Sequence, residues 1–293
     1  MNKISSLSCI LSCCILAAGM LNSCDHPYEQ KEPKFSNIMD LDDQRFRLGL
    51  PLGAKAMHIG EARFSTARLS YYANNHAAYN ALMQNKIDGY LYDSHALDYV
   101  AANSPDVAVL PGSVGKVDIA IGIAPKNKDL LAAINNFIDQ YKKDGTYEAM
   151  YERWVNPPGL KDGEISDAAE IPEMPQIATP AEPTRKLVVG TSSEAEPMCF
   201  SIPGSEKGTT TLTGFDMELL RRLALHLNVQ VELREMDYVG LTNGLISGEL
   251  DLVIAGLNKT EEREKRNIIF SKSYIDSNIV VLVRSEQVAK QEK

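Results

Sequence analysis

A threonine and an arginine three positions apart, in residues 256–263, could bind an anion. The segment reads GLNKTEER, and its pattern predicts a strand, a loop and a helix that begins at Thr260. The start of a helix presents free amide groups, and Arg263 in the first turn could donate two hydrogen bonds to the same anion. The alternative is that Thr260 is only a helix cap, that Glu261 and Glu262 balance the helix dipole, and that Arg263 is a solvated surface charge.

Asp93 could bind a cation. It follows the apolar strand expected at residues 88–92 and stands where a helix begins. Backbone amides stabilise a carboxylate at this position, and capping its own helix is the commoner use of such an aspartate. Asp88, at the head of the same strand, has a structural role in our interpretation.

Residues for catalysis or metal binding are scattered. No Ser/His/Asp order stands out, and no Cys/His cluster could hold zinc. The histidines, each interpreted as a surface or core residue, are His26, His58, His76, His95 and His226. We therefore expect no enzyme activity, no cofactor and no metal, with Glu194 or Glu196 as the only candidate acid if a catalytic role existed.

Two runs of alternating short strands and amphipathic helices must position these residues. The alternation is typical of α/β folds with parallel sheets. In the first run, strands are expected at 45–50, 88–92, 107–110 and 117–125, and helices at 77–86, 95–103, 129–143 and 147–155. In the second, strands are expected at 186–192, 229–233, 251–257 and 279–284, and helices at 214–228, 241–248 and from Thr260.

Composition limits the possible partners. The 293 residues carry a net charge of −9 without a basic run, so nucleic acid is not an expected partner. Residues 156–185 are rich in Pro, Ala and acids without a sustained period, which predicts a linker.

The N-terminus has the features of a secretory signal. A lysine near the start precedes an apolar run of about a dozen residues, too short for a permanent membrane span. The alternatives are a lipoprotein signal with lipidation at Cys24, a plain cleaved signal, or an apolar N-terminus with an incidental cysteine. If Cys9, Cys13 and Cys14 leave with the signal and Cys24 carries lipid, only Cys199 remains, and no disulfide within the chain is expected.

Long segments of both runs resemble type II periplasmic solute-binding proteins, specifically the amino-acid receptors of ABC transporters (bacterial extracellular solute-binding protein family 3). The most specific segments are DLVIAGLNKTEER and KKDGTYEAMYERW. The resemblance implies an α/β fold with two lobes that close like a clamshell on a ligand. The family's second half comes first in this chain, so we expect a circular permutation, the alternative being a fragment of a tandem array.

Permutation sets the expected domain boundaries. About 30 linker residues, at about 3.1 Å each when extended, could reach roughly 90 Å and join the family's old termini. One covalent crossover between the lobes, near 117–125, is expected to remain. The expected segments are a lipoprotein signal peptide at 1–23, a tether at 24–40, the second lobe at 41–118, the return hinge strand and closing helices of the first lobe at 119–155, the linker at 156–185, the first lobe at 186–284 and a polar tail at 285–293.

The resemblance also implies residue roles. An amino acid is a zwitterion, which needs cationic and amide donors for its carboxylate and an acceptor for its ammonium. The resemblance implies that Arg263 and Thr260 bind the carboxylate and that the Gly256 carbonyl and Asp93 accept from the ammonium. The other positions that match family ligand contacts are Asn258, Tyr238, Gly53, Ala54 and Ser192.

Three departures from the family pattern leave the ligand's side chain undecided. Gly53-Ala54-Lys55 stands where the family usually has Gly-Thr-Thr, and Ala195 and Ser192 replace an aromatic residue and an acid. The pocket could be wider, could suit a small polar or aliphatic side chain, or could favour an acidic group through Lys55. Tyr238 keeps an aromatic wall, with a core tyrosine as the alternative.

Hinge closure on an amino acid is the expected mechanism. The expected setting is the periplasm or cell surface, with a lipid anchor to the membrane and an ABC-transporter permease as partner. The alternatives are a sensory or regulatory module for a membrane partner, or a relative of the dehydratases or transglycosylase-associated domains that share the fold.

Overall fold

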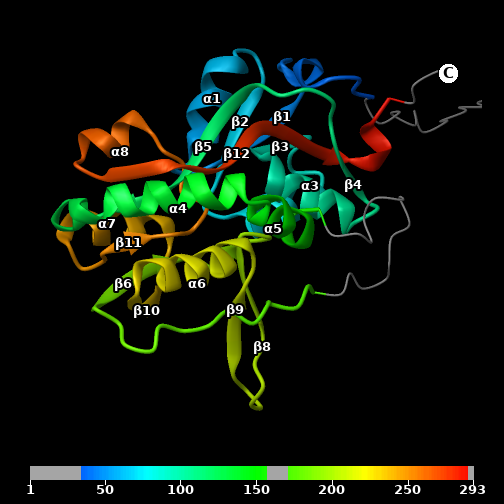
Figure 1. The fold of residues 1–293 in the computed structure, drawn as a ribbon. Helices are drawn as coiled ribbons and strands as arrows, with labels where there is room; N and C mark the ends of the chain where they lie inside the picture. Colours follow the sequence, from blue (N-terminus) through cyan, green and yellow to red (C-terminus); the bar gives the residue numbers. More distant parts are fainter. Residues whose placement is uncertain (1–33, 157–170, 290–293) are drawn as a thin grey trace, which may run out of the picture. The chain divides into compact units, whose positions relative to one another are not determined.

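A nine-stranded mixed sheet runs through the part of the chain that the computed structural model describes, residues 34–156 and 171–289. The strand order is β10-β6-β11-β5-β12-β3-β1-β2, with β4 beside β12. Helices pack on both halves of this sheet and form two lobes, as Figure 1 shows. We define lobe A as residues 34–114 and 279–289, and lobe B as residues 119–156 and 171–275. The expected leader at 1–23, Cys24 and residues 157–170 of the expected linker lie outside the described residues.

Lobe A is built from parallel strands and the helices that connect them. Strand β1 pairs in parallel with both β2 and β3, and their apolar faces share one core with the helices. The carboxyl ends of these strands therefore meet at one edge, where loops can form a site. The elements are η1 (Ile38–Leu41), β1 (Arg47–Pro51), α1 (Lys55–Arg63), β2 (Arg68–Tyr72), α2 (Asn75–Met83), β3 (Gly89–Asp93), α3 (Ser94–Ala102) and β4 (Val107–Val109).

Lobe B repeats this strand and helix alternation around its own core. Helix α4 shows why the sequence folds this way, because Ile134, Phe137, Ile138 and Tyr141 recur at helical spacing and are all buried. The elements before residue 157 are η2 (Pro125–Leu130), α4 (Leu131–Lys143) and α5 (Thr146–Trp154). Those after residue 170 are β6 (Arg185–Thr191), β7 (Glu194–Ala195), β8 (Cys199–Pro203), β9 (Thr210–Thr213), α6 (Phe215–Leu227), β10 (Val229–Glu235), α7 (Tyr238–Ser247), β11 (Leu252–Val253) and α8 (Glu261–Lys265).

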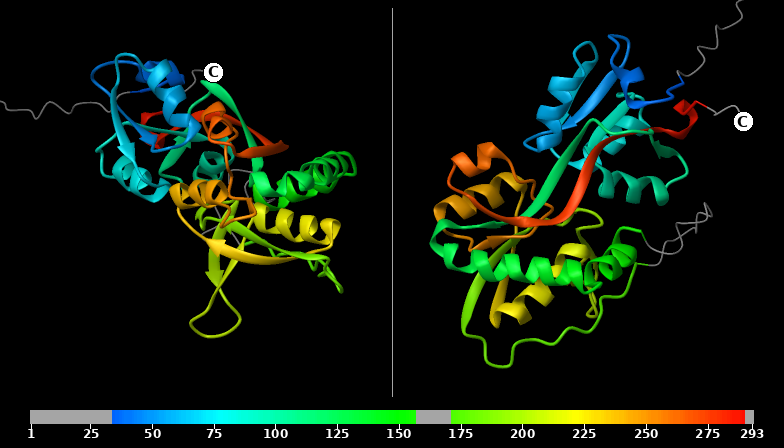
Figure 2. Two further views of the ribbon diagram at one scale, coloured as in Figure 1. Left: turned by 90° about the vertical axis from the view of Figure 1, so that its left-hand side faces the viewer. Right: turned by 45° about the horizontal axis from the view of Figure 1, so that its top comes forward.

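Two long antiparallel strands cross between the lobes. Strands β5 (Gly115–Ile123) and β12 (Ile269–Arg284) pair from Ile269↔Ile123 to Ile279↔Gly115 and lie side by side in Figure 2. Ile275 of β12 is in the core of lobe B, whereas Ile279 is in the core of lobe A. The expectation of a single crossover is therefore wrong. At about 3.3 Å per residue, a strand of 16 residues is long enough to serve both lobes.

Lobe A includes residues from both ends of the described chain that we expected to lie outside it. Phe35 and Ile38, which we expected in a tether, are buried in its core. Gln287 in η4 (Ser285–Gln287), which we expected in a polar tail, is also fully buried. Phe35 forms a parallel bridge with Val288, so the two ends of the described fold lie together. The composition of these short segments predicted a tether and a polar tail, and only their pairing across the fold places them in the core of lobe A.

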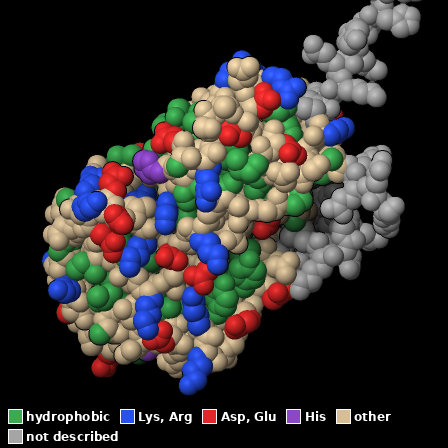
Figure 3. Space-filling view, turned by 90° about the horizontal axis from the view of Figure 1, so that it is seen from above, with side chains coloured by type: hydrophobic (Ala, Val, Ile, Leu, Met, Phe, Trp, Pro, Cys, Tyr) green, Lys and Arg blue, Asp and Glu red, His purple; other side chains and the backbone are tan. Residues whose placement is uncertain are grey.

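The molecular surface carries charges of both signs. On the face in Figure 3, Lys and Arg side chains are interspersed with Asp and Glu rather than gathered by sign. Among the described residues, no helix combines the length and apolar character needed to cross a membrane.

Candidate ligand-binding site

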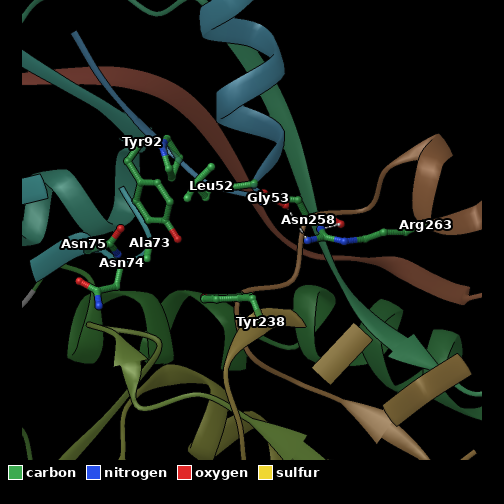
Figure 4. A pocket seen from close by; sticks show the side chains of 12 residues that line it. Leu52, Gly53, Ala73, Asn74, Asn75, Tyr92, Tyr238, Asn258 and Arg263 are labelled. Carbon is green, nitrogen blue, oxygen red and sulfur yellow. Dashed lines mark hydrogen bonds between the residues drawn. The ribbon is translucent and has the colours of Figure 1, made fainter. Parts of the chain in front are cut away.

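A cavity lies between the two lobes at the carboxyl ends of the lobe A strands. It encloses about 470 Å³ of space not filled by atoms, part of it open to solvent. Figure 4 shows Arg263 at one end of this cavity and Asn74 and Asn75 at the other. The lining residues are Pro51, Leu52, Gly53, Ala54, Ala73, Asn74, Asn75 and Tyr92 from lobe A, and Tyr238, Gly256, Asn258 and Arg263 from lobe B.

Arg263 is buried between the lobes rather than solvated. Its side chain leaves the short helix α8 and is surrounded by protein, and burial lowers the pKa of its guanidinium. Nη1 donates to the Asn258 carbonyl at 2.6 Å, and Nη2 donates to the Gly53 carbonyl of lobe A at 3.2 Å. The interpretation of Arg263 as a surface charge is therefore wrong, and its guanidinium lines the cavity.

Thr260 caps its own helix. It has extended backbone angles, and its hydroxyl accepts a hydrogen bond from the Arg263 amide at 3.2 Å. Thr260 does not line the cavity. The geometry of Thr260 is therefore that of a helix cap, the alternative given above. The cap fixes the first turn of α8, from which Arg263 projects.

The loop before α1 contributes backbone groups to the same end of the cavity. Gly53 has φ of +74°, a conformation that suits glycine, and its carbonyl accepts from Arg263. Ala54 is the N-cap residue of α1 and makes no side-chain capping bond. The Lys55 amide donates to Asn258 Oδ1 at 3.4 Å. The Met57 amide donates to the Ala54 carbonyl at 3.1 Å, so at least two amides of this first turn already have acceptors within the protein.

Asp93 does not cap its helix, contrary to the commoner use of such an aspartate. Its side chain is 3% exposed and makes no capping bond to α3. Instead, Asn258 Nδ2 of lobe B donates to Asp93 Oδ2 at 3.2 Å. Asp93 Oδ1 is buried and has no hydrogen-bond partner in the described structure. A buried carboxylate oxygen without a donor is an acceptor that can receive a ligand's hydrogen bond.

Burial raises the pKa of Asp93 to about 6, although the Asn258 amide, the Arg263 guanidinium and Lys55 each act to lower it. The carboxyl can therefore change charge near neutral pH.

Gly256 and Tyr238 line the lobe B side of the cavity. Gly256 has φ of +58°, and its amide donates to Asp216 Oδ2 at 2.7 Å. Asp216 Oδ1 accepts from the Tyr274 hydroxyl at 2.8 Å, and burial raises the pKa of Asp216 to about 7. The Tyr238 hydroxyl donates to the Ala255 carbonyl at 3.0 Å. These bonds hold the loop between β11 and α8 in one conformation.

Six of the nine expected ligand-binding residues line one cavity, and their binding of a ligand stays a prediction. Asp93 does not line the cavity but is hydrogen-bonded to Asn258, which does. Thr260 and the buried Ser192 do not line the cavity either. Sequence reasoning missed Tyr92 and the loop residues of lobe A. The available signal was their position, because loops at the carboxyl ends of parallel strands commonly form ligand sites. The missed residues are Pro51, Leu52, Ala73, Asn74, Asn75 and Tyr92.

In the described part of the chain, no three or more His, Cys, Asp or Glu side chains lie close enough together to hold a metal ion. His95 is buried, and its Nδ1 lies 3.1 Å from the Ser277 hydroxyl.

Comparisons with known proteins identify partial relatives. The arginine-binding extracellular protein ArtP of Bacillus subtilis is 31% identical over 102 residues, which are 35% of this chain and 37% of ArtP. The L-cystine-binding protein TcyA of Bacillus subtilis is 31% identical over 100 residues, 34% of this chain and 35% of TcyA. A solved ancestral arginine-binding protein bound to arginine has 42% identity, with a TM-score of 0.25, over 28% of this chain and 34% of that protein. The chain thus matches little more than a third of the length of these relatives.

A family model covers much more of the chain. The model for bacterial extracellular solute-binding proteins, family 3, matches residues 29–157 and 187–292, which together form most of the sequence. This match confirms the resemblance inferred from the sequence segments, and the two α/β lobes agree with it. The chain therefore belongs to the bacterial extracellular solute-binding proteins, family 3.

Proposed function

We propose that this protein is an extracytoplasmic receptor that captures a free amino acid between its lobes and performs no chemistry on it. The observation that carries the proposal is the pairing of a buried guanidinium with a buried carboxylate oxygen that lacks a donor. A zwitterion would supply a charged acceptor for Arg263 in place of a neutral carbonyl, and a donor for Asp93 Oδ1. Its carboxylate can accept from Arg263, and its ammonium can donate to Asp93 Oδ1.

Hinge closure is the proposed mechanism. Arg263 donates across the lobes to the Gly53 carbonyl, and Asn258 donates across them to Asp93. A ligand carboxylate would replace the Gly53 carbonyl as the acceptor for Arg263, exchanging a neutral acceptor for a charged one. Strands β5 and β12 connect the lobes and would bend as the lobes open. Ligand binding then shifts the population toward the closed form, because only that form supplies both halves of the site.

The transport role rests on the family and on the names of relatives. Curated relatives include proteins named as arginine-binding and L-cystine-binding, and one named as a probable amino-acid ABC transporter-binding protein. We propose that this chain likewise delivers its ligand to an ABC-transporter permease. In this proposal it works at the periplasmic or cell surface and is anchored through lipid on Cys24.

We also propose that the order of the lobes results from circular permutation. The pairing of Phe35 with Val288 supports this proposal, because it brings the two ends of the described fold together within one lobe. The strands from both parts of the sequence also join in one sheet. A fragment of a tandem array would instead leave sheet positions to be filled by a neighbouring repeat.

Thermal unfolding followed by calorimetric titration tests the binding function. The protein is screened with each common amino acid and with small dicarboxylates at millimolar concentration. A ligand at 100 times its Kd adds about 2.7 kcal/mol of stability, a shift of a few degrees. Arg263→Ala should cost about 2–5 kcal/mol of binding free energy, because the ligand's carboxylate loses a buried charged partner.

Arg266→Ala is the matched control. Arg266 is exposed, donates to Asn243 Oδ1 and does not line the cavity. It should retain the affinity of the unmodified protein. A protein that unfolds cooperatively but responds to none of these compounds would refute amino-acid capture, and full affinity in Arg263→Ala would refute the site.

A further inference from the structure

A second cavity adjoins the candidate site on its lobe A side. It encloses about 830 Å³ of space not filled by atoms, part of it open to solvent. Most of its wall comes from helices α2 and α3, and we call it the tyrosine chamber because Tyr79, Tyr90 and Tyr99 line it. Glu196 is the one lining residue that comes from lobe B.

Asn75 connects the two cavities, because it lines both of them. The walls also adjoin along strand β3, where Tyr92 lines the first cavity and Tyr90 lines the chamber. The two rings are stacked, with centroids 5.8 Å apart and planes 12° apart. The Tyr90 hydroxyl donates to Asn75 Oδ1 at 2.6 Å, which fixes the junction between the cavities.

The position of Arg263 sets the direction of a bound amino acid. In Figure 4, Asn75 lies at the end of the first cavity opposite Arg263. An amino acid whose carboxylate pairs with Arg263 can therefore extend its side chain past Tyr92 toward Asn75. A long side chain would reach the tyrosine chamber from there by passing Asn75, which lines both cavities.

The chamber combines aromatic rings with one carboxylate. Among its lining residues, Glu196 is the only Asp or Glu, and His76 is the only basic residue. Burial raises the pKa of the Tyr99 hydroxyl, and the nearby charge of Glu196 acts in the same direction. Aromatic faces and a carboxylate both attract a cation, whereas they offer an anionic side chain no counter-charge.

We propose that the tyrosine chamber receives the ligand's side chain and that Glu196 selects a long side chain ending in a positive charge, as in arginine or lysine. This inference rests on the proposed function of the neighbouring cavity. Because Glu196 belongs to lobe B and the tyrosines to lobe A, the charged end of the ligand meets its full set of partners only when the lobes are closed. Selectivity and closure are thus coupled.

A comparison of L-arginine with L-citrulline tests the chamber directly. The two ligands have closely similar shapes, but only arginine carries a charge at the end of its side chain. Calorimetric titration of the full protein should give at least about tenfold tighter binding of arginine, the effect of a charge with a carboxylate and aromatic partners. Glu196 is exposed, so Glu196→Gln should weaken arginine binding only about 3- to 10-fold and change citrulline binding less than about twofold.

Two further variants separate the chamber from general effects. Glu206→Gln makes the same charge change in the exposed loop between β8 and β9, outside both cavities, and should leave both affinities unchanged. Tyr99→Leu removes an aromatic face and should reduce the preference for arginine about threefold.

The outcomes distinguish the two proposals. If no amino acid binds the unmodified protein, the proposed function itself fails. If amino acids bind and Arg263→Ala abolishes the binding, but arginine and citrulline bind equally or Glu196→Gln has no effect on their ratio, the chamber inference alone is overturned.

Discussion

Ligand affinity should depend on the charge of Asp93. A ligand ammonium pairs with the ionised carboxylate, whereas the ligand-free carboxyl titrates with a pKa of about 6 because it is buried. Protons therefore compete with the ligand at low pH. We expect the affinity for a zwitterionic amino acid to fall as the pH decreases from 8 to 5.

The magnitude follows from the ionised fraction. At pH 8, about 99% of Asp93 is ionised in the ligand-free protein, and at pH 5 about 9% is. If only the ionised form binds, Kd rises about elevenfold between these values, or about 1.4 kcal/mol. His95, whose pKa burial lowers to about 4, remains neutral over most of this range.

The stability of the ligand-free protein should change in the opposite direction. The folded pKa of Asp93 lies above its ordinary value of 3.8, so the folded state holds more protons than the unfolded chain between these values. The resulting stability is present below about pH 4 and is lost as the pH rises through 6, a change on the order of 3 kcal/mol. Asp216, with a pKa of about 7, contributes in the same direction.

The assay is calorimetric titration at pH 5, 6, 7 and 8, with the tightest-binding amino acid other than histidine, whose ring would itself titrate. Asp93→Asn is the control, since it keeps the side-chain shape but cannot ionise. It should bind more weakly at pH 8 and show a flat profile, while Asp216 still titrates. An unchanged Kd for the unmodified protein from pH 5 to 8, or the same slope in Asp93→Asn, would refute the assigned role of Asp93.

Two further predictions concern the core of lobe B. Glu218 is fully buried and accepts hydrogen bonds from Arg153, Trp154 Nε1 and Arg222. Glu218→Gln should therefore lower the free energy of unfolding, measured by urea denaturation, by about 3 kcal/mol, because two arginines lose their buried counter-charge. A loss below about 0.5 kcal/mol would contradict this prediction. Cys199 is buried and free, and burial raises the pKa of its thiol to about 12. Iodoacetamide at pH 8 should therefore leave Cys199 unmodified in the folded protein and modify it in urea, as measured by peptide mass spectrometry; rapid modification of the folded protein would show that the thiol is accessible.

Much of the fold could be predicted because its signals are local. The helical spacing of Ile134, Phe137, Ile138 and Tyr141 identifies the buried face of α4 without any knowledge of its partners. The segment 256–263 likewise brings Gly256, Asn258 and Arg263 to one cavity, since a few consecutive residues encode the strand end, the cap and the first helical turn.

The sequence by itself therefore determined the alternation of strands and helices, the family, and half of the residues around the cavity. The tertiary structure decided what depends on contacts between distant segments. Asp93 and Asn258 are 165 positions apart, and only their meeting across the lobes turns a possible helix cap into a buried carboxylate with a raised pKa. Strand β12 serves both lobes because its two halves pack in different cores, and Glu196 of lobe B lines a chamber whose other walls come from lobe A. Local patterns specify which face of an element is apolar, but burial and electrostatic environment arise only when the elements pack together.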